Sequence, residues 1–447
     1  MIEGKQKFDI VIEGGTLLTM VDGQGPIPDA RVLISGNRIQ EVSTGNISPL
    51  PETDTVIYAN DAIVLPGLVN AHVHSPMTIF RGMSDDLPLK TWLFDHIFPA
   101  EAKYMNPDSV FWGSLLGCLE MIASGTTTFV DGYFFAEDII KATDKAGMRA
   151  LVAQGVIDFP APGVPEPEKN LDVASSFLER WINFSDLIMP GIFCHSPVTC
   201  SANTLRKAYE ISDRFSLPLQ IHLSETKEEV AEIEKMTGLR PVFFLDSLGL
   251  LNSKLIAVHV IYLNEDEIEC LAKKDVKIAH CPESSMKLGS GIAEVARMLE
   301  KGLVVGIGTD GCASNNNLDL FGEMDATAKL AKVAGRDPTL LNAAKVLNMA
   351  TVAGAKVIGL DNEIGTIEAW KKADIIIVDT NTPHMTPMYN PYSQLVYSAT
   401  GGDVRDVIID GKIVYRDRQF TIVDSDEVME KVNSIGWRIF KERGNYI

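Results

Sequence analysis

Two histidines that stand two residues apart at the end of an apolar run constrain this chain most strongly. They are His72 and His74, within PGLVNAHVHSPM, residues 66–77. Because successive side chains of a β-strand point to opposite faces, an H-x-H pair places both imidazoles on one face. Two imidazoles aimed at one point suit a divalent metal such as zinc, which binds imidazole nitrogen at about 2.0–2.1 Å. The alternative is a pair of polar residues that closes a strand, and the pair alone does not exclude it.

Polar residues also end other strand-like runs far along the chain. His222 closes LPLQIHLS, His259 lies in LIAVHV, and Asp310 ends VVGIGTDG. Short apolar runs alternate with longer amphipathic segments, which is typical of a parallel sheet covered by helices. Eight such runs span residues 67–74, 126–133, 149–157, 187–196, 217–224, 255–263, 276–284 and 304–311. We therefore predict an α/β fold, a (β/α)8 TIM-type barrel over 66–365, with its active site at the C-terminal ends of the strands.

The two ends of the chain have a different, β-rich pattern. Strand-like stretches broken by Gly, Asn and Asp-Gly turns cover residues 8–20, 30–42, 373–379 and 404–420. Because chain termini often lie close together, we expect 1–65 and 366–447 to build one small β-sandwich domain. A helix over 428–444 is expected to close the chain. The alternative is two unrelated terminal hairpins.

Charge and composition narrow the class of protein. The formal net charge of −20 argues against nucleic acid or an anionic membrane surface as a partner. No uncharged run approaches the roughly 18 residues that span a bilayer, and the N-terminus has no apolar stretch typical of a signal peptide. Six scattered cysteines without a C-x-x-C pattern suit a reducing compartment. We expect a cytoplasmic enzyme, and the sequence leaves open whether it is a monomer or a homo-oligomer.

Motifs along nearly the whole chain resemble the amidohydrolase superfamily. The motifs are PGLVNAHVH, IHLSET (221–226), AVH (257–259) and GTDG (308–311), together with the flanking β segments. Three further stretches are similar to the 5′-methylthioadenosine/S-adenosylhomocysteine deaminases and their chlorohydrolase relatives. They are SPMTIFRGMSDDLPLKTWLFDHIFPAE (75–101), HCPESSMKL (280–288) and TDGCASNNNLDLFGEM (309–324).

The resemblance implies a metal site built from His72, His74, His222 and Asp310. Three neutral imidazoles and one carboxylate leave room for a water on zinc, which lowers the pKa of that water to about 7. Binuclear relatives bridge two metals through a modified lysine near the end of the fourth strand, and residues 187–199 contain no lysine. We therefore expect one divalent ion per chain, with zinc preferred over Fe²⁺ or Mn²⁺.

The resemblance also implies catalytic roles for Glu225, His259 and Asp310. A deaminase needs a carboxyl group that carries a proton to the ring nitrogen and then to the leaving ammonia, and Glu225 follows His222 by three residues. His259 would orient and deprotonate the attacking water, and Asp310 would accept a hydrogen bond from it. The alternatives are a solvated loop glutamate beside Lys227 and a histidine satisfied in the core.

Two more residues, Glu101 and His195, match positions that contact the nucleoside in the family, and Trp92 lies nine residues before Glu101. Glu101 would bind the ribose hydroxyls, although a glutamate at a helix start is also favoured by the helix dipole. Trp92 would wall or stack on the purine, unless it packs only in the core. His195 would contact the nucleoside as well.

One departure from the family concerns the 5′ substituent. Relatives that process adenosylhomocysteine have arginines around and after the third strand, where this chain has Gln154 and the proline-rich loop 158–170. Glutamine lacks the charged fork that binds a carboxylate, and Lys169 is the one candidate substitute in that loop. Methylthioadenosine, 5′-deoxyadenosine or adenosine is therefore expected to be favoured over adenosylhomocysteine as substrate.

These observations predict a metal-dependent hydrolase that converts a 5′-substituted adenosine into the inosine analogue and ammonia. The nearest alternative is a deaminase or chlorohydrolase of another N-heterocycle, such as guanine, pterin, cytosine or an s-triazine. A remote alternative is a non-catalytic structural barrel. Such barrels tend to lose metal ligands, whereas this chain keeps every residue of the set.

Overall fold

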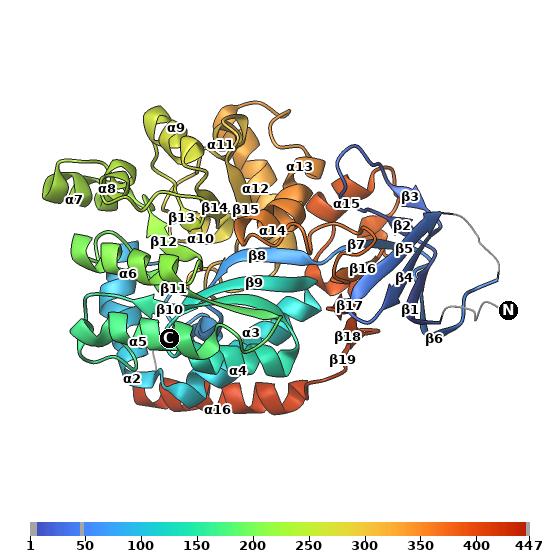
Figure 1. Cartoon of the computed structure of the whole chain (residues 1–447), viewed down its shortest axis with the longest axis horizontal. Helices are drawn as coiled ribbons and strands as arrows, with labels where there is room; N and C mark the ends of the chain where they lie inside the picture. The colour runs from blue at the N-terminus through green and yellow to red at the C-terminus, as the bar shows by residue number, and fades with distance from the viewer. Residues whose placement is uncertain (1–6, 45–48, 444–447) are drawn as a thin grey trace.

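Eight parallel strands form the centre of the computed structural model, which describes residues 7–44 and 49–443 (Figure 1). Strands that follow one another in the sequence are neighbours in the sheet, and each lies within one of the eight predicted runs. They are β8 (Leu68–Val73), β9 (Thr126–Tyr133), β10 (Arg149–Val156), β11 (Ile188–Cys194), β12 (Leu219–Leu223), β13 (Leu255–His259), β14 (Lys277–His280) and β15 (Val304–Ile307). The chain after β15 meets β8, because the backbone N–H groups of Thr309 and Asp310 donate to the His72 carbonyl over 3.1 Å. The predicted barrel is confirmed.

Helices cover the outer face of the barrel strands. All residues of β9 and β10 are buried, as expected for strands with both faces covered. Side-chain caps fix several helix starts: the Asn106 side chain accepts from the N–H of Ser109, and the Asn264 side chain from the N–H of Glu267. The helices between the strands are α3 (Pro107–Ala123), α4 (Ala136–Ala146), α5 (Asn170–Trp181), α6 (Ala202–Arg214), α7 (Lys227–Thr237), α8 (Pro241–Ser247), α9 (Glu265–Lys273), α10 (Pro282–Lys287) and α11 (Val295–Glu300).

The connection from β8 to α3 is long and covers the C-terminal end of the barrel. It contains η1 (Ser75–Phe80), α1 (Leu89–Thr91), η2 (Trp92–Ile97) and α2 (Phe98–Tyr104). The Trp92 Nε1–H donates to the Ser84 carbonyl over 3.1 Å, which ties two parts of the connection together. Two predicted substrate-binding residues, Trp92 and Glu101, therefore lie in a cover above the strand ends.

The two chain ends build a second β structure beside the barrel (Figure 1). Its strands are β1 (Phe8–Glu13), β2 (Thr16–Leu17), β3 (Ile27–Pro28), β4 (Ala30–Ser35), β5 (Arg38–Thr44), β6 (Thr53–Tyr58), β7 (Ala62–Pro66), β16 (Ile375–Asp379), β17 (Val404–Ile409), β18 (Lys412–Arg416) and β19 (Gln419–Phe420). Strand β7 pairs antiparallel with β16, so that Val64 lies opposite Ile377. Ile12 of the other sheet belongs to the same buried cluster as these two residues. The predicted sandwich is confirmed and the alternative of two unrelated hairpins is wrong, whereas the exact domain boundaries at 65/66 and 365/366 stay predictions.

The chain ends with helices that return along the barrel. After β15 come α12 (Leu320–Gly335), α13 (Ala343–Asn348), η4 (Met349–Ala353), α14 (Gly354–Val357) and α15 (Pro391–Tyr397), with the short turns η3 (Pro167–Lys169), η5 (Pro383–Met385) and η6 (Gly401–Asp403) elsewhere. The final helix α16 (Ser425–Arg443) corresponds to the predicted closing helix and lies along α3, and residue 444 is outside the described residues. Among the described residues, no helix has both the length and the apolar character required to cross a membrane.

Candidate functional site

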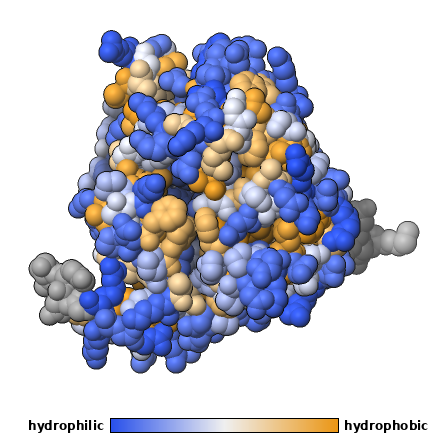
Figure 2. Space-filling view, turned by 90° about the vertical axis from the view of Figure 1, so that its left-hand side faces the viewer, coloured by the Kyte–Doolittle hydropathy of each residue, from blue (hydrophilic) through white to orange (hydrophobic). Residues whose placement is uncertain are grey.

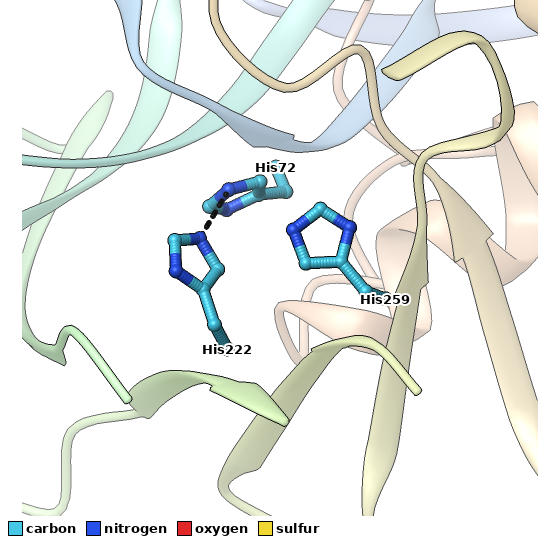
Figure 3. Close-up of side chains that lie close together, drawn as sticks. All are labelled: His72, His222 and His259. Atoms are coloured by element: carbon cyan, nitrogen blue, oxygen red, sulfur yellow. Dashed lines mark hydrogen bonds between the residues drawn. The ribbon is translucent and has the colours of Figure 1, made fainter. Parts of the chain in front are cut away.

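Four side chains that the sequence singled out as metal ligands meet at the C-terminal end of the barrel. The His72 Nε2 atom lies 3.2 Å from His222 Nε2 and 3.6 Å from Asp310 Oδ1, and His74 Nε2 lies 3.4 Å from the same oxygen. His259 approaches the group as well, and its ring faces those of His72 and His222 in Figure 3. The donors come from β8 and the residue after it, from β12, and from the turn that follows β15, so only the closed barrel brings them together.

Hydrogen bonds fix which nitrogen each of the β8 histidines offers to the centre. The Nδ1–H of His72 donates to Gln220 Oε1, and the Nδ1–H of His74 donates to the Gly132 carbonyl over 2.6 Å. Because Nδ1 carries the proton in both rings, the lone pair of Nε2 is free and points to the shared centre. This donor set fits a divalent metal of the zinc type.

Asp310 is held by groups that leave one of its oxygens available. Its Oδ2 accepts hydrogen bonds from Ser284 Oγ over 2.6 Å and from Ser314 Oγ over 2.7 Å, while Oδ1 faces the histidines. The turn that carries it is tight: Asp310 has a φ of 59°. A Cβ on Gly308 would lie 2.7 Å from the His72 backbone nitrogen, so this close approach requires glycine.

Burial keeps His74 and His222 neutral, which is the form of histidine that binds a metal. Loss of solvation, reinforced by neighbouring imidazoles, lowers the pKa of His74 to about 3 and the pKa of His222 well below its usual value. Burial opposes ionisation of Asp310, but the nearby histidines outweigh it and hold the pKa of this carboxyl well below its usual value. The site therefore combines neutral imidazoles with a carboxylate at neutral pH.

Glu225 lines the same cavity, and its pKa is raised, whereas the pKa of the predicted ligand Asp310 is lowered. Its side chain is 14% exposed, and its Oε2 lies 3.9 Å from His259 Nε2. Loss of solvation, with the nearby charge of Asp310, raises the pKa of Glu225 to about 8, so the carboxyl group is protonated at neutral pH. The Ser290 hydroxyl donates to its Oε1 over 3.4 Å. A protonated carboxyl beside a metal-type site is placed to donate a proton.

The backbone that carries Glu225 is anchored by another glutamate that sequence reasoning missed. Glu229 Oε1 accepts from the N–H of Ser224 over 3.0 Å, and its Oε2 accepts from the N–H of Glu225 over 2.7 Å. Ser224 has a φ of 53°, and its carbonyl accepts from the N–H of Ile261 over 3.0 Å, two residues beyond His259. The Glu225 and His259 loops are thus joined at Ser224.

Glu101 and Trp92 line the cavity on the side of the cover. Glu101 is buried, and the Tyr133 hydroxyl donates to its Oε1 over 2.5 Å. Burial raises the pKa of Glu101 to about 7 against the opposing effect of this hydrogen bond. Trp92 and His195 also line the cavity, and the Nδ1 of His195 lies 2.9 Å from Thr199 Oγ1. The structure thus brings Glu101, Trp92 and His195 together with Glu225 around one cavity.

Gln154 and Lys169 do not line the cavity that contains Glu101 and Glu225. Gln154 Oε1 accepts from the N–H of Ala136 at the start of α4 over 3.2 Å, so its side chain leaves β10 on the face opposite the cavity. The next residue, Gly155, lines the cavity instead. Lys169 forms an ion pair with Glu166 and borders the outer pocket that contains Gln154. The structure does not bring Gln154 together with the other predicted substrate residues.

The cavity continues past Glu101 into a second, mainly apolar space. Glu101, Phe98 and Phe134 line both spaces. The other residues of the second space are Phe94, Ala102, Ile157, Phe159, Pro160, Ala161 and Pro162. None of the lining residues carries a positive charge. Figure 2 shows the face of the molecule at the strand ends, where apolar side chains reach the surface among hydrophilic ones.

The sequence analysis did not identify several residues that contact the site residues. For two of them, Gln220 and Tyr133, a sequence pattern pointed to the site. Gln220 stands two residues before His222 in the same strand, so alternation places both on one face. Tyr133 ends a predicted barrel strand, where site residues are expected. Ser284, Ser314 and Glu229 had no signal, because serine and glutamate near a turn are common on solvated surfaces.

Comparisons with known proteins agree with this geometry. Residues 63–414 match the model of the amidohydrolase family. The chain is 44% identical to 5-methylthioadenosine/S-adenosylhomocysteine deaminase 1 of Syntrophus aciditrophicus, over 97% of this chain and 98% of that protein. It is also 44% identical to 5′-deoxyadenosine deaminase of Methanothermobacter thermautotrophicus, over 91% of this chain and 94% of that protein. A zinc-bound crystal structure of an adenosine deaminase from Xanthomonas campestris superimposes with a TM-score of 0.94, at 36% identity over 97% of this chain and 99% of the other. The chain belongs to the amidohydrolase family.

Proposed function

We propose that this protein is a metal-dependent aminohydrolase that converts a 5′-substituted adenosine into the inosine analogue and ammonia. Relatives over nearly the full length of the chain are named as deaminases of such nucleosides. The observation that carries the proposal is the position of the Glu225 carboxyl, which lines one cavity together with the metal-type site and the buried Glu101. Glu225 would supply a proton to the ring and Glu101 would bind the sugar. These two roles fit a nucleoside better than a bare base.

His72, His74, His222 and Asp310 would hold one divalent ion, with His259 beside them as a further nitrogen within ligand distance of His72 and His222. Zinc is the preferred metal for this donor set. When bound, such an ion would make water acidic enough to supply the attacking oxygen as hydroxide at neutral pH. His195 replaces the bridging lysine of binuclear sites near the end of β11, which supports a single ion.

The residues of the chain divide the proton transfers between them. Glu225 gives its carboxyl proton to the ring nitrogen as the neighbouring carbon is attacked, which removes charge that would build up on the ring. His259, close to Glu225, orients the attacking water and receives its proton. Glu225, then ionised, takes up the second proton of the attacking water and passes it to the leaving nitrogen, so that ammonia departs neutral. The proton held by His259 then returns to Glu225, 3.9 Å away, which restores both groups for the next turnover.

The apolar space beyond Glu101 supports a specific class of 5′ substituent. If Glu101 binds the ribose hydroxyls, the 5′ carbon is directed toward the space lined by Phe98, Phe134 and Phe159. A methylthio group or hydrogen is favoured there because it loses little hydration, whereas the zwitterionic tail of adenosylhomocysteine finds no cation among the lining residues. We therefore propose methylthioadenosine or 5′-deoxyadenosine as the preferred substrate.

The main experiment is a spectrophotometric assay of the zinc-loaded enzyme against adenine nucleosides, free bases and a chlorotriazine. We expect turnover of the nucleosides, and the Glu101→Ala variant should lose far more activity on adenosine than on adenine. Turnover restricted to bases or triazines would refute the proposed substrate class. Equal losses on adenosine and adenine would refute the ribose role of Glu101.

A second experiment tests the 5′ substituent separately. A charge-assisted hydrogen bond to a carboxylate is worth about 1.5–3 kcal/mol, or roughly 10–150-fold in affinity. We expect kcat/KM for methylthioadenosine to equal or exceed that for adenosylhomocysteine, and Phe159→Arg to shift the ratio toward adenosylhomocysteine. Lys169→Ala is the control and should leave the ratio unchanged. A strong wild-type preference for adenosylhomocysteine would refute the apolar subsite.

The cysteines support a location in the cytoplasm. All six are free thiols, and five of them are buried. Free thiols persist where the surroundings are reducing, and burial protects them from oxidation. A small nucleoside is the proposed partner, and the acidic net charge of −20 disfavours nucleic acid and anionic membranes.

A further inference from the structure

The outer face of helix α16 is apolar where it meets solvent. Its inner face packs on the barrel through Val428, Val432, Ile435 and Ile439. On the outer side, Met429 is 45% exposed, Trp437 62% and Phe440 45%. Trp437 and Phe440 lie edge to face with their ring centroids 5.7 Å apart. Large apolar side chains grouped on one exposed helix face mark an interaction surface.

The charged residues that flank these apolar side chains change sign along the helix, from acidic near its start to basic near its end. Asp426 and Glu430 lie toward its N-terminus, and Arg438 and Lys441 lie toward its C-terminus, with Asn433 between them. The ion pair that α16 forms within the described residues joins Glu442 to Lys103 and uses none of these four charges. Acidic residues near the start and basic residues near the end also suit the helix dipole. The dipole does not account for the exposed aromatic residues between them.

Gly436 lies in the middle of the same helix without a contact that requires it. A Cβ added at this position meets nothing within 4 Å, so packing inside the chain does not exclude a larger residue. Glycine in a helix interior is less favourable than alanine. A small residue beside Trp437 and Phe440 allows another helix to approach closely.

We propose that α16 is the surface through which two copies of this chain associate around a two-fold axis. In an antiparallel pair of α16 helices centred on Asn433, Asp426 faces the partner's Lys441 and Glu430 faces the partner's Arg438. Asn433 then lies at the axis, and Trp437, about one helical turn away, covers the partner's Met429. A second copy of the chain fits this face, because in an antiparallel pair the acidic half of one helix meets the basic half of the other.

This surface is connected to the cover of the active site. Glu442 pairs with Lys103 over 3.0 Å, two residues after Glu101 in α2. Arg443 donates to the Met83 carbonyl and the Ser84 hydroxyl, both over 3.4 Å, and Ser84 also accepts from Trp92. Figure 1 shows α16 along the outside of the barrel, with its outer side away from the other elements. Association through α16 would therefore hold the segment that carries Glu101 and Trp92.

A contact of one helix from each copy belongs to the small end of specific interfaces, below about 1,200 Å² in total. We therefore expect reversible dimerisation that rises with protein concentration and weakens with salt. Light scattering and sedimentation velocity over a concentration series measure it on the full chain, independently of substrate turnover.

Charge reversal gives the decisive test. Lys441→Asp should shift the equilibrium to monomer, and the double variant Asp426→Lys with Lys441→Asp should restore the dimer, because both ion pairs are rebuilt with opposite sign. Trp437→Asp should abolish association, and Lys235→Asp on exposed α7 is the control that should leave it unchanged. A wild-type chain that stays monomeric at high concentration refutes the proposal. A dimer that survives Trp437→Asp, or a double variant no better than Lys441→Asp, refutes it as well.

Discussion

The Glu229 carboxylate accepts a hydrogen bond of 2.7 Å from the backbone N–H of Glu225, and its other oxygen holds the N–H of Ser224. A carboxylate that binds two successive amides fixes the direction in which the Glu225 side chain leaves the backbone. Glu229 does not line the cavity that contains His74, Glu101 and Glu225, and we expect it to act by positioning Glu225.

The first prediction concerns this anchor. Glu229→Gln replaces one accepting oxygen by an NH₂ group that faces an N–H, so one hydrogen bond of roughly 1.5–3 kcal/mol is lost. We expect kcat to fall about tenfold or more with little change in KM, since substrate contacts stay in place. Steady-state kinetics, metal content and thermal melting of the variant check this expectation.

Glu228→Gln is the matched control, because Glu228 is the preceding residue of α7 and is exposed. It should keep wild-type kinetics. A Glu229→Gln enzyme with normal kcat, or one that loses KM alone, would show that the anchor does not position the catalytic group.

The second prediction separates proton transfer from metal binding. Glu225→Gln keeps the shape of the side chain but removes its transferable proton, and we expect turnover to fall by roughly 10²-fold or more. Elemental analysis should find the same metal content as in the wild type, because the ligand set does not include Glu225. If the variant turns over substrate at the normal rate, the general acid lies elsewhere.

The third prediction concerns metal stoichiometry. The enzyme purified with excess zinc should hold about one equivalent per chain, and a chelator should abolish activity that added zinc restores. Asp310→Asn should weaken zinc binding, because a neutral amide replaces the carboxylate. His195→Asn is the control and should keep the metal. A reproducible content near two equivalents would contradict a single-metal site.

The fourth prediction links the buried Glu101 to the pH dependence of stability. Its pKa is raised to about 7 by burial, above the ordinary value of 4.5. The protonated form fits the folded site, so this stabilising contribution is complete below pH 4.5 and is lost as the pH rises through about 7. The free energy at stake is about 3 kcal/mol at most, from 1.36 kcal/mol for each pKa unit.

The neutral variant Glu101→Gln removes this dependence. Relative to the wild type, its melting temperature should rise between pH 5 and pH 8, with the largest gain at the alkaline end. The control is Glu228→Gln, because Glu228 is an exposed glutamate. Glu442 does not serve as a control, because it forms an ion pair with Lys103. A melting difference that does not change with pH would show that Glu101 is not buried as described.

Periodicity along the chain was sufficient to predict the barrel. The eight predicted runs each contain one strand, since strands with both faces covered are rich in apolar residues. The alternation of side chains likewise placed His72 and His74 on one face, and the structure brings both to Asp310. The turn-rich pattern of the two chain ends also predicted that they pair. In the structure, β7 pairs antiparallel with β16.

Only the tertiary structure decided which side chains face the cavity and what holds them. On β10, alternation allows either Gln154 or Gly155 to face inward, and the closed barrel turns Gln154 toward α4. The pKa of Glu225 rises because the fold removes solvent around it, a property that spacing in the sequence does not encode. The role of Glu229 depends on the positive φ of Ser224, which bends the chain so that two amides point at one carboxylate. Local sequence fixes periodicity, whereas orientation and solvation arise from contacts between segments far apart in the chain.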